Sequence, residues 1–333
     1  MMKVLFVSGG NNGDFRIAPF IKTQGDSLDE NGISLTYYSI RGRGLWGYLR
    51  NIIPLRHLIK QDDYDLVHSH YSLCGWVSAL TCTFGLPKIV SYMGCDVYGD
   101  YDRKGHLMPL SLINILSARI LQFFVKRIIV KSENLKHYVD LKKKVHVLPN
   151  GVNTLQFHPT EKKEARKQLS LHPNKRYVLF MGEKANLRKN YPLLEEAGKL
   201  LKEEVELLTP YPIPYFMINT YLNACDVLAL TSFQEGSPNI IKEAMACNTP
   251  VVSTGVGDVR WILGDTPGCY LTSFTPEDVA EKLQHALDFA RKNGKTQGRA
   301  RILQLGLDSE TIAGRLIDIY EGLQKTKLDV ATH

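Results

Sequence analysis

The chain has 333 residues, of which 44% are hydrophobic, and its formal net charge is +7. This length is sufficient for two α/β domains with separate cores, although one larger domain would also fit. The six cysteines form no C-x-x-C pair and the apolar run after Lys3 is short, which argues against zinc sites, disulfides and a signal peptide and favours a cytosolic protein.

The first half alternates short apolar strands with helical segments, which is typical of a doubly wound parallel sheet. We expect strands at residues 4–8, 34–40, 66–70, 88–93, 127–132 and 145–149. The turn after the first strand contains Gly9, Gly10 and Gly13, which would let the backbone approach a phosphate or a sugar. This turn is not a G-x-G-x-x-G motif, so an ordinary strand-to-helix turn is the alternative.

All of the excess charge lies in residues 1–150, which contain 19 Lys or Arg against 12 Asp or Glu, whereas the remainder balances at 22 against 22. Residues 40–60 interleave arginines with Trp46 and other apolar residues. A basic face of this kind suits an anionic membrane surface. The alternative is an ordinary solvated face with Trp46 in the core.

Residues 109–132 are the longest apolar candidate for a membrane span, but polar residues interrupt them. We expect an amphipathic helix to about Phe124 and then a buried strand at 127–131. Any membrane contact would therefore be peripheral.

A polar stretch at 158–176 predicts a linker and a short surface helix, so we divide the chain into domains at 1–160 and 161–308. In the second domain we expect strands at 177–182, 205–208, 227–232 and 250–254, and helices at 191–204, 215–224, 238–247 and 276–292. Prolines at 210, 212 and 214 exclude a central strand there. A last helix is expected at about Ser309 to Gln324.

Residues 231–258 place two acids around a turn that opens a helix. Glu235 precedes the turn, where Ser237 can cap the helix and Pro238 suits its first position. The free amides of a helix start bind phosphate. Glu243 lies about one and a half turns into the helix, where it can accept hydrogen bonds from vicinal hydroxyls. A diphosphate beside a ribose would satisfy both features.

The two glutamates, separated by seven residues and followed by AMACNTPVVS and the pair Gly257-Asp258, resemble the retaining glycosyltransferases of family four, or glycosyl transferases group one. The segments MKVLFVSGG, DLVHSHYS, IVSYMGCDVYG, HVLPNGVNTLQFHP and YLNACDVLALTS also resemble the landmarks of that family, in their usual order. The resemblance implies a GT-B fold, in which two Rossmann-like domains face a central cleft. It also implies that the last helix crosses back onto the N-terminal, acceptor-side domain, while 161–308 bind the nucleotide sugar.

The resemblance implies metal-independent transfer of a sugar, with retention, from a UDP- or GDP-type donor to a hydroxyl of a glycan or lipid-linked saccharide. Glu235 would contact the donor sugar and Glu243 the ribose, and the glycines of the first turn would lie at the donor. The nucleotide sugar is then a substrate, and no cofactor is expected.

The leaving diphosphate needs electrostatic stabilisation, which is commonly the largest catalytic term. Lys189 and Arg188 can supply it, together with the amides of Gly236, Ser237 and Asn239. The sequence contains no D-x-D placed to hold a divalent cation.

The chain departs from the family pattern at two positions. Glu183 stands where an arginine is expected, and Arg188 or Lys184 is the candidate replacement. Met93 stands where the family often has a histidine near the reacting sugar, which leaves Asp96 as a catalytic or structural carboxylate. We interpret His68 and His70 as structural residues.

Two other classes of protein stay open from the residues alone. One is a nucleotide-sugar epimerase or a phosphorylase of the same two-domain architecture. The other is a basic nucleic-acid-binding protein, but the sequence has no recognised RNA or DNA module, so we expect no nucleic-acid partner. We favour a cytoplasmic enzyme of cell-surface polysaccharide biosynthesis, peripheral at the inner face of the plasma membrane.

Overall fold

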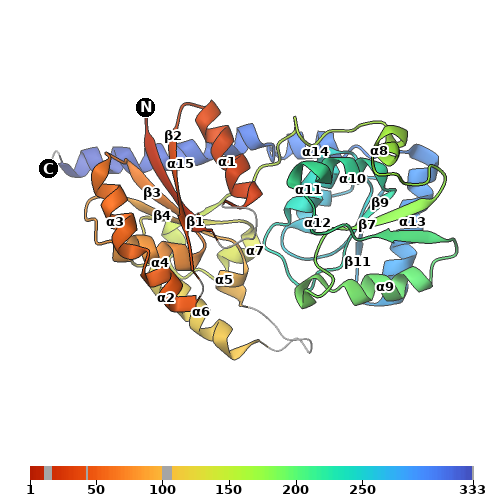
Figure 1. The fold of residues 1–333 in the computed structure, drawn as a ribbon, viewed down its shortest axis with the longest axis horizontal. Coiled ribbons are helices and arrows are strands. Elements are labelled where there is room, and N and C mark those ends of the chain that lie inside the picture. The colour runs from red at the N-terminus through yellow and green to blue at the C-terminus, as the bar shows by residue number, and fades with distance from the viewer. Residues whose placement is uncertain (11–16, 43, 100–106, 332–333) are drawn as a thin grey trace. The chain divides into compact units, whose positions relative to one another are not determined.

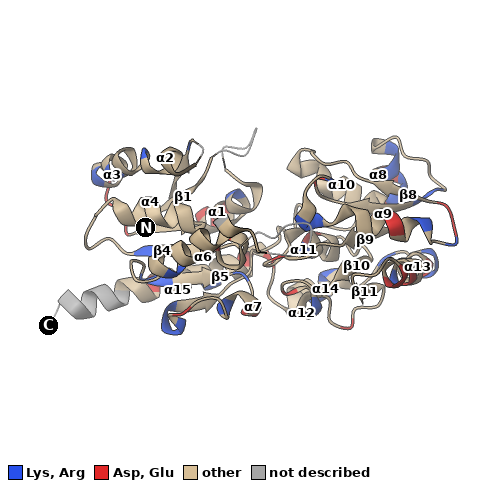
Figure 2. Cartoon of the chain, turned by 90° about the horizontal axis from the view of Figure 1, so that it is seen from below, with Lys and Arg blue, Asp and Glu red and all other residues tan. Residues whose placement is uncertain are grey.

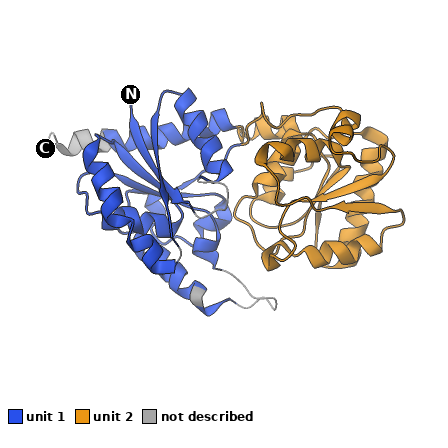
Figure 3. Ribbon diagram, viewed as in Figure 1, with its two compact units in different colours: residues 1–151, 309–333 blue, residues 152–308 orange. Residues whose placement is uncertain are grey.

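The computed structural model describes residues 1–10, 17–42, 44–99 and 107–331. Two compact units share the chain: unit 1 contains residues 1–151 and 309–333, and unit 2 contains residues 152–308 (Figure 3). Each unit has a parallel β-sheet and a hydrophobic core of its own. The predicted alternation of strands and helices is therefore confirmed in both halves.

Unit 1 is built on six parallel strands in the order β2-β1-β3-β4-β5-β6 (Figure 1). All six predicted strands are confirmed. The strands at residues 3–9, 66–70, 88–92 and 127–130 are largely buried, as expected of a parallel sheet that helices cover, whereas those at 34–40 and 145–147 are only partly buried. The strands are β1 (Lys3–Gly9), β2 (Ser34–Ile40), β3 (Leu66–His70), β4 (Lys88–Tyr92), β5 (Arg127–Val130) and β6 (Val145–Val147). The described helices are α1 (Pro19–Glu30), α2 (Gly44–Leu49), α3 (Ile52–Gln61), α4 (Ser72–Leu80), α5 (Cys95–Tyr98), α6 (Pro109–Leu121), α7 (Glu133–Lys136) and α15 (Ser309–Ala331).

Unit 2 is built on five parallel strands in the order β11-β10-β9-β7-β8. The strands are β7 (Arg176–Phe180), β8 (Val205–Leu208), β9 (Val227–Leu230), β10 (Val251–Thr254) and β11 (Cys269–Thr272). The sequence did not predict β11, a strand of four residues between a turn and a helix. The helices are α8 (Lys162–Gln168), α9 (Tyr191–Lys199), α10 (Ile218–Ala224), α11 (Asn239–Ala246), α12 (Val259–Leu263), α13 (Pro276–Asn293) and α14 (Gly298–Gln304).

The strand order reverses once in each unit. In unit 1 the reversal separates β1 from β3, and in unit 2 it separates β7 from β9. Ligands of open α/β sheets bind beyond the carboxyl ends of the strands at such a point. The loops that follow β7 and β9 are therefore the first place to look for a site in unit 2.

Residues 152–160 lie in unit 2, which differs from the boundary after residue 160 that we expected. The amide of Val152 donates to the carbonyl of Leu307 at 2.9 Å. The guanidinium of Arg299 donates to the carbonyls of Thr154 at 2.9 Å and Phe157 at 2.8 Å. These bonds hold the segment to the end of unit 2, a pairing that local composition does not reveal.

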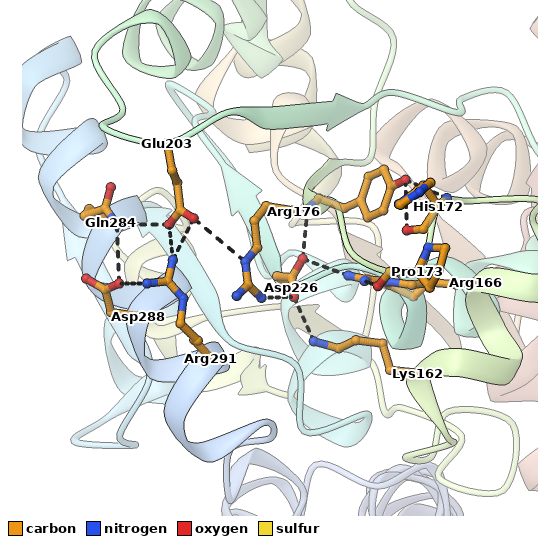
Figure 4. Close-up of polar contacts among 12 residues, drawn as sticks. Lys162, Arg166, His172, Pro173, Arg176, Glu203, Asp226, Gln284, Asp288 and Arg291 are labelled. Atoms are coloured by element: carbon orange, nitrogen blue, oxygen red, sulfur yellow. Dashed lines mark hydrogen bonds and ion pairs between the residues drawn. The ribbon is translucent and has the colours of Figure 1, made fainter.

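A buried ion network holds the amino ends of the strands in unit 2 (Figure 4). Asp226, which directly precedes β9, accepts a hydrogen bond from the amide of Tyr177 at 2.8 Å. Its carboxylate also pairs with Lys162 at 2.8 Å, Arg166 at 2.9 Å and Arg176 at 3.5 Å. The network links α8 to the amino ends of β7 and β9, which lie opposite the carboxyl ends of the strands.

Within the described part of the chain, no helix combines the length and the hydropathy needed to cross a bilayer. The predicted amphipathic helix is α6, which ends at Leu121 rather than at about Phe124. Of the six cysteines, Cys82 and Cys95 are exposed.

Candidate active site

Two loops of unit 2 meet at the carboxyl ends of β7 and β9. Arg188 and Lys189 lie in a short 3-10 turn between β7 and α9, and Glu235 lies between β9 and α11. The amide of Phe233 donates to the carbonyl of Arg188 at 2.9 Å. The hydroxyl of Thr231 donates to the carbonyl of Lys189 at 3.2 Å. These bonds join the loops although 46 residues separate Lys189 from Glu235.

The carboxylate of Glu235 is held by both cations that the sequence assigned to the leaving group. Its oxygens lie 2.5 Å from the Arg188 guanidinium and 2.6 Å from the Lys189 ammonium. The hydroxyl of Ser232 donates to the same carboxylate at 2.9 Å. Burial raises the pKa of Glu235, but the charges of Lys189 and Arg188 outweigh it and hold the pKa below its usual value. Glu235, Arg188 and Lys189 therefore form a triad with one net positive charge.

Glu243 lies on α11 and is almost fully buried. The hydroxyl of Tyr215 donates to its Oε1 at 2.8 Å. Burial raises the pKa of Glu243 to about 7, against the opposing effects of Tyr215 and the neighbouring Lys242. The carboxylate is thus poised to change its charge near neutral pH. Neither Tyr215 nor Lys242 was predicted as a site residue from the sequence.

The start of α11 differs by one position from the predicted one. The helix begins at Asn239, and Pro238 occupies the capping position without a side-chain cap. Ser237 is therefore one residue too early to cap, and its hydroxyl instead accepts a hydrogen bond from the Lys242 ammonium at 3.0 Å. The prediction that Ser237 caps the helix and Pro238 is its first residue is wrong.

Lys242 is buried behind the turn that Gly236 and Ser237 form. Burial lowers the pKa of Lys242 to about 8, although the charges of Asp258 and Glu243 act to raise it. Burial likewise raises the pKa of Asp258, against the effect of the Lys242 charge. A lysine and two acids therefore share the interior beneath the turn.

Gly257 packs directly against this turn. Its backbone has a φ of +56°, and a Cβ there would lie 2.5 Å from the carbonyl oxygen of Gly236. Any other residue would meet both the strain of positive φ and this contact. Gly257 is therefore required by the shape of the turn that carries Glu235.

The glycine-rich turn of unit 1 is described only in part. Gly9 is the last residue of β1, and the amide of Gly10 donates to the carbonyl of Ile40 at 2.8 Å. The amide of Gly10 is therefore already hydrogen-bonded to the last residue of β2. Gly13 lies outside the described residues.

Asp96 accepts hydrogen bonds from three backbone amides: Met93 at 3.0 Å, Gly94 at 2.9 Å and Ser72 at 3.2 Å. Burial raises the pKa of Asp96 to about 6, and these amides act to lower it. The bonds hold the loop after β4 against the start of α4, which favours the structural role for this carboxylate. A catalytic role for Asp96 stays a prediction.

His68 and His70 are both buried in unit 1. The Nδ1 atom of His68 lies 2.6 Å from the hydroxyl of Tyr320, and Nε2 lies 2.8 Å from that of Ser91. The ring of His70 stacks on that of His68 at 4.5 Å. Burial lowers the pKa of both histidines well below its usual value. These contacts favour the structural interpretation of His68, and the partner Tyr320 was not foreseen.

Arg188 and Lys184 are the candidate replacements for the arginine expected at the position of Glu183. Arg188 contacts Glu235, whereas the Lys184 ammonium lies 4.7 Å from the ring centre of Tyr191. Among the residues that the structure describes, no three His, Cys, Asp or Glu side chains come together as metal ligands could. Metal independence stays a prediction.

Two family models match successive parts of the chain. A model described as Glycosyltransferase Family 4 matches residues 5–156, and one described as Glycosyl transferases group 1 matches residues 163–288. The chain is also similar to TuaC of Bacillus subtilis (strain 168), which is named as a teichuronic acid biosynthesis glycosyltransferase. The two are 24% identical over 274 residues, which cover 74% of this chain and 68% of TuaC.

Solved structures resemble the fold over nearly the whole chain. Sucrose-phosphate synthase from Thermosynechococcus elongatus has a TM-score of 0.78 at 18% identity, and covers 98% of this chain and 100% of that one. HepE from Anabaena in complex with UDP has a TM-score of 0.72 at 16% identity, with coverage of 96% and 100%. Together with the two parallel-sheet units, these likenesses confirm the expected GT-B fold.

Proposed function

The chain belongs to the family 4, group 1 glycosyltransferases, and on this basis we propose which reaction it performs. It transfers a sugar from a nucleotide-diphosphate sugar to a hydroxyl of a glycan or a lipid-linked saccharide, with retention of the anomeric configuration. The observation that supports this most directly is the contact of Glu235 with Arg188 and Lys189 beside the start of α11.

The cations of this triad are suited to a leaving diphosphate. A nucleoside diphosphate gains negative charge as the bond to the sugar breaks, and fixed positive groups stabilise that charge most in a site from which water is excluded. Arg188 and Lys189 are already ordered by Glu235, so little reorganisation is needed when phosphate oxygens approach them. In our proposal the phosphates share the cations with Glu235, and the carboxylate accepts hydrogen bonds from the donor sugar.

Glu243 is our candidate for the ribose of the donor. It lies on α11, and only one described hydrogen bond, from Tyr215, satisfies its Oε1 atom. A carboxylate can accept further hydrogen bonds from two adjacent hydroxyls. Ionisation of Glu243, whose pKa burial raises to about 7, would strengthen those bonds.

We assign a UDP-type donor, with a GDP-type donor as the alternative. The support is the likeness to HepE, which was solved with UDP. For the acceptor we favour an intermediate of cell-surface polysaccharide synthesis, supported by the name of TuaC. Such intermediates are carried on lipids, so we place the enzyme in the cytoplasm with a peripheral contact to the membrane.

A thermal-shift experiment tests the donor site. The protein is heated with UDP, GDP or ADP, and we expect UDP to raise the melting temperature, because a ligand at 100 times its Kd stabilises by about 2.7 kcal/mol. Lys189→Met should abolish most of this shift. The exposed Lys199 provides the matched control, and Lys199→Met should respond as the wild type does.

Two outcomes would count against the proposal. If no nucleoside diphosphate shifts the melting temperature, the donor assignment fails. If UDP stabilises Lys189→Met as fully as the wild type, the site lies elsewhere. Retention is checked separately by NMR of the anomeric proton of the product, and an inverted product would refute it.

A further inference from the structure

The outer face of α6 is apolar. A helix on the surface of a globular unit ordinarily turns charged and polar residues to water. Here the inner face is buried through Ser111, Ala118 and Leu121, and the outer face is also largely hydrophobic. The exposed apolar residues of the helix and of the turn after it are Leu112, Ile113, Leu116, Ile120, Phe123 and Phe124. A surface of this kind marks an interaction site.

A second apolar element lies on the same side of the sheet. Helices α2, α3, α4 and α6 form one layer of unit 1, and both α2 and α6 contact α4 (Figure 1). On α2, Leu45 and Trp46 are exposed, Trp46 by 81%. The alternative interpretation that placed Trp46 in the core is therefore wrong.

Basic residues surround the carboxyl end of α6. The ammonium of Lys144 donates to the carbonyls of Gln122 at 2.9 Å and Val125 at 2.8 Å, which fixes it beneath the exposed phenylalanines. Burial lowers the pKa of Lys144, and the charges of Lys126 and Arg127 lower it further, so these cations lie close together. The ribbon of α6 itself carries little charge, whereas Lys and Arg are visible around α7 (Figure 2).

The segment that contains α6 is rich in basic residues. Residues 103–144 contain ten Lys or Arg and only two acids, Glu133 and Asp140. Both acids are already paired, Glu133 with Lys136 at 3.5 Å and Asp140 with Arg119 at 3.4 Å. Lys126, Lys142 and Lys143 are exposed, so positive charge borders the carboxyl end of the apolar face. Its partner should be apolar in the middle and anionic at that border.

We propose that the outer face of α6, with the basic residues at its carboxyl end, docks onto an anionic phospholipid bilayer. The apolar side chains would enter the boundary between headgroups and acyl chains, and the lysines would meet the phosphates. A second copy of the chain would bring the same positive charge to the contact, and like charges would repel. The inference deepens the membrane contact of the proposed function and rests on it.

Vesicle sedimentation tests the apolar part of the surface. The purified protein is mixed with vesicles of phosphatidylcholine alone or with phosphatidylglycerol, and we expect binding to the anionic vesicles. The double variant Leu116→Gln, Phe123→Gln removes two exposed apolar side chains and should weaken binding at least about 10-fold. The matched control is Leu200→Gln, Leu303→Gln in unit 2, whose side chains are 53% and 51% exposed, and it should bind as the wild type does.

A second pair of variants tests the charge. Lys126→Gln, Lys143→Gln removes two exposed lysines near α6 and should weaken binding to anionic vesicles by about 30-fold. Lys199→Gln, Lys292→Gln removes two exposed lysines of unit 2 and should leave binding unchanged. High salt should weaken wild-type binding in the same direction.

Three results would overturn the proposal: no binding to anionic vesicles, equal binding by the Leu116, Phe123 variant, or a wild-type dimer that this variant converts to a monomer. The last would assign the face to a second copy. The stabilisation by UDP is measured on every variant and should persist in the α6 variants. Vesicle binding without any response to UDP would refute the donor assignment but not the docking surface.

Discussion

At the scale of single residues, the carboxylate of Glu235 contacts both cations that we assign to the leaving diphosphate. Glu183 stands where we expected an arginine, and Arg188 follows five residues later. Its guanidinium lies 2.5 Å from the Glu235 carboxylate. In our proposal Arg188 therefore supplies the positive charge that the expected arginine would have supplied.

The pKa of Glu243 leads to a prediction about stability. Burial raises this pKa from 4.5 to about 7, so between these values the folded chain binds a proton that the unfolded chain releases. The contribution of Glu243 to the free energy of unfolding is therefore present at low pH and lost as the pH rises through 7, by about 3 kcal/mol. Urea unfolding of the wild type and Glu243→Gln between pH 5 and 8 measures it.

The free energy of unfolding of the wild type, relative to that of Glu243→Gln, should therefore fall as the pH rises. Lys242, whose pKa burial lowers to about 8, is present in both and affects both at the upper end of the range. The exposed Glu321 gives the control, because Glu321→Gln should follow the wild type at every pH. A constant difference between wild type and Glu243→Gln would show that Glu243 does not titrate in this range.

The sequence predicted the site residues better than their contacts. Glu235, Glu243, Arg188 and Lys189 were named from spacing, residue type and the family resemblance, and the structure brings Glu235 together with both cations. Their roles stay predictions. Tyr215 was missed because a segment rich in prolines carried no sign that its hydroxyl reaches α11. Partners that are distant in sequence depend on which strands become neighbours, and local sequence patterns do not reveal this.

At the scale of elements, strands with continuous apolar runs were predicted well, because a parallel sheet covered on both faces buries most side chains of its central strands. The strand β11 (Cys269–Thr272) was missed; it lies at the edge of the sheet, and three of its four residues are only partly buried. The start of α11 was displaced by one residue, because both Ser237 and Pro238 carry helix-start signals. The hydroxyl of Ser237 accepts a hydrogen bond from Lys242 instead of capping the helix.

The turn that carries Glu235 depends on Gly257, and Gly257→Ala tests this. The added Cβ would meet the carbonyl oxygen of Gly236 at 2.5 Å in a backbone with a φ of +56°. We expect a loss of about 2 kcal/mol or more in the free energy of unfolding, together with weaker UDP binding. Chemical unfolding and thermal shifts with UDP measure the two effects.

Gly294 provides the matched control. Its φ of +77° has the same sign, but a Cβ there would have no heavy atom within 4 Å. Gly294→Ala should therefore cost only the strain of positive φ, about 1 kcal/mol, and leave UDP binding unchanged. If both variants bind UDP as the wild type does, Gly257 does not shape the donor site.

At the scale of the whole molecule, the last helix belongs to the unit that the first residues begin. Helix α15 packs against α1, and its Tyr320 lies 2.6 Å from the Nδ1 atom of the buried His68. The contact joins residues that are 252 positions apart. Sequence patterns predicted the helix but not this polar anchor in the core.

Tyr320→Phe should reveal the strength of this anchor. The change keeps the ring and leaves the buried Nδ1 of His68 without its partner, so we expect a loss of about 1–3 kcal/mol in the free energy of unfolding. Tyr138→Phe, at a half-exposed position of the same unit, should change it by less than about 0.5 kcal/mol. Equal values for the two variants would show that the hydroxyl does not hold α15.

Because α15 follows unit 2 in the chain but belongs to unit 1, the two units are completed in a fixed order during synthesis. A ribosome translates residues 152–308 in one stretch, so every residue of unit 2 has been added before Ser309. Unit 1 is complete only after residues 309–333 have been made. Until then His68 lacks its partner Tyr320 on α15. Nascent domains generally fold as units. The half of the polypeptide that is made later is therefore the first to have every residue it needs.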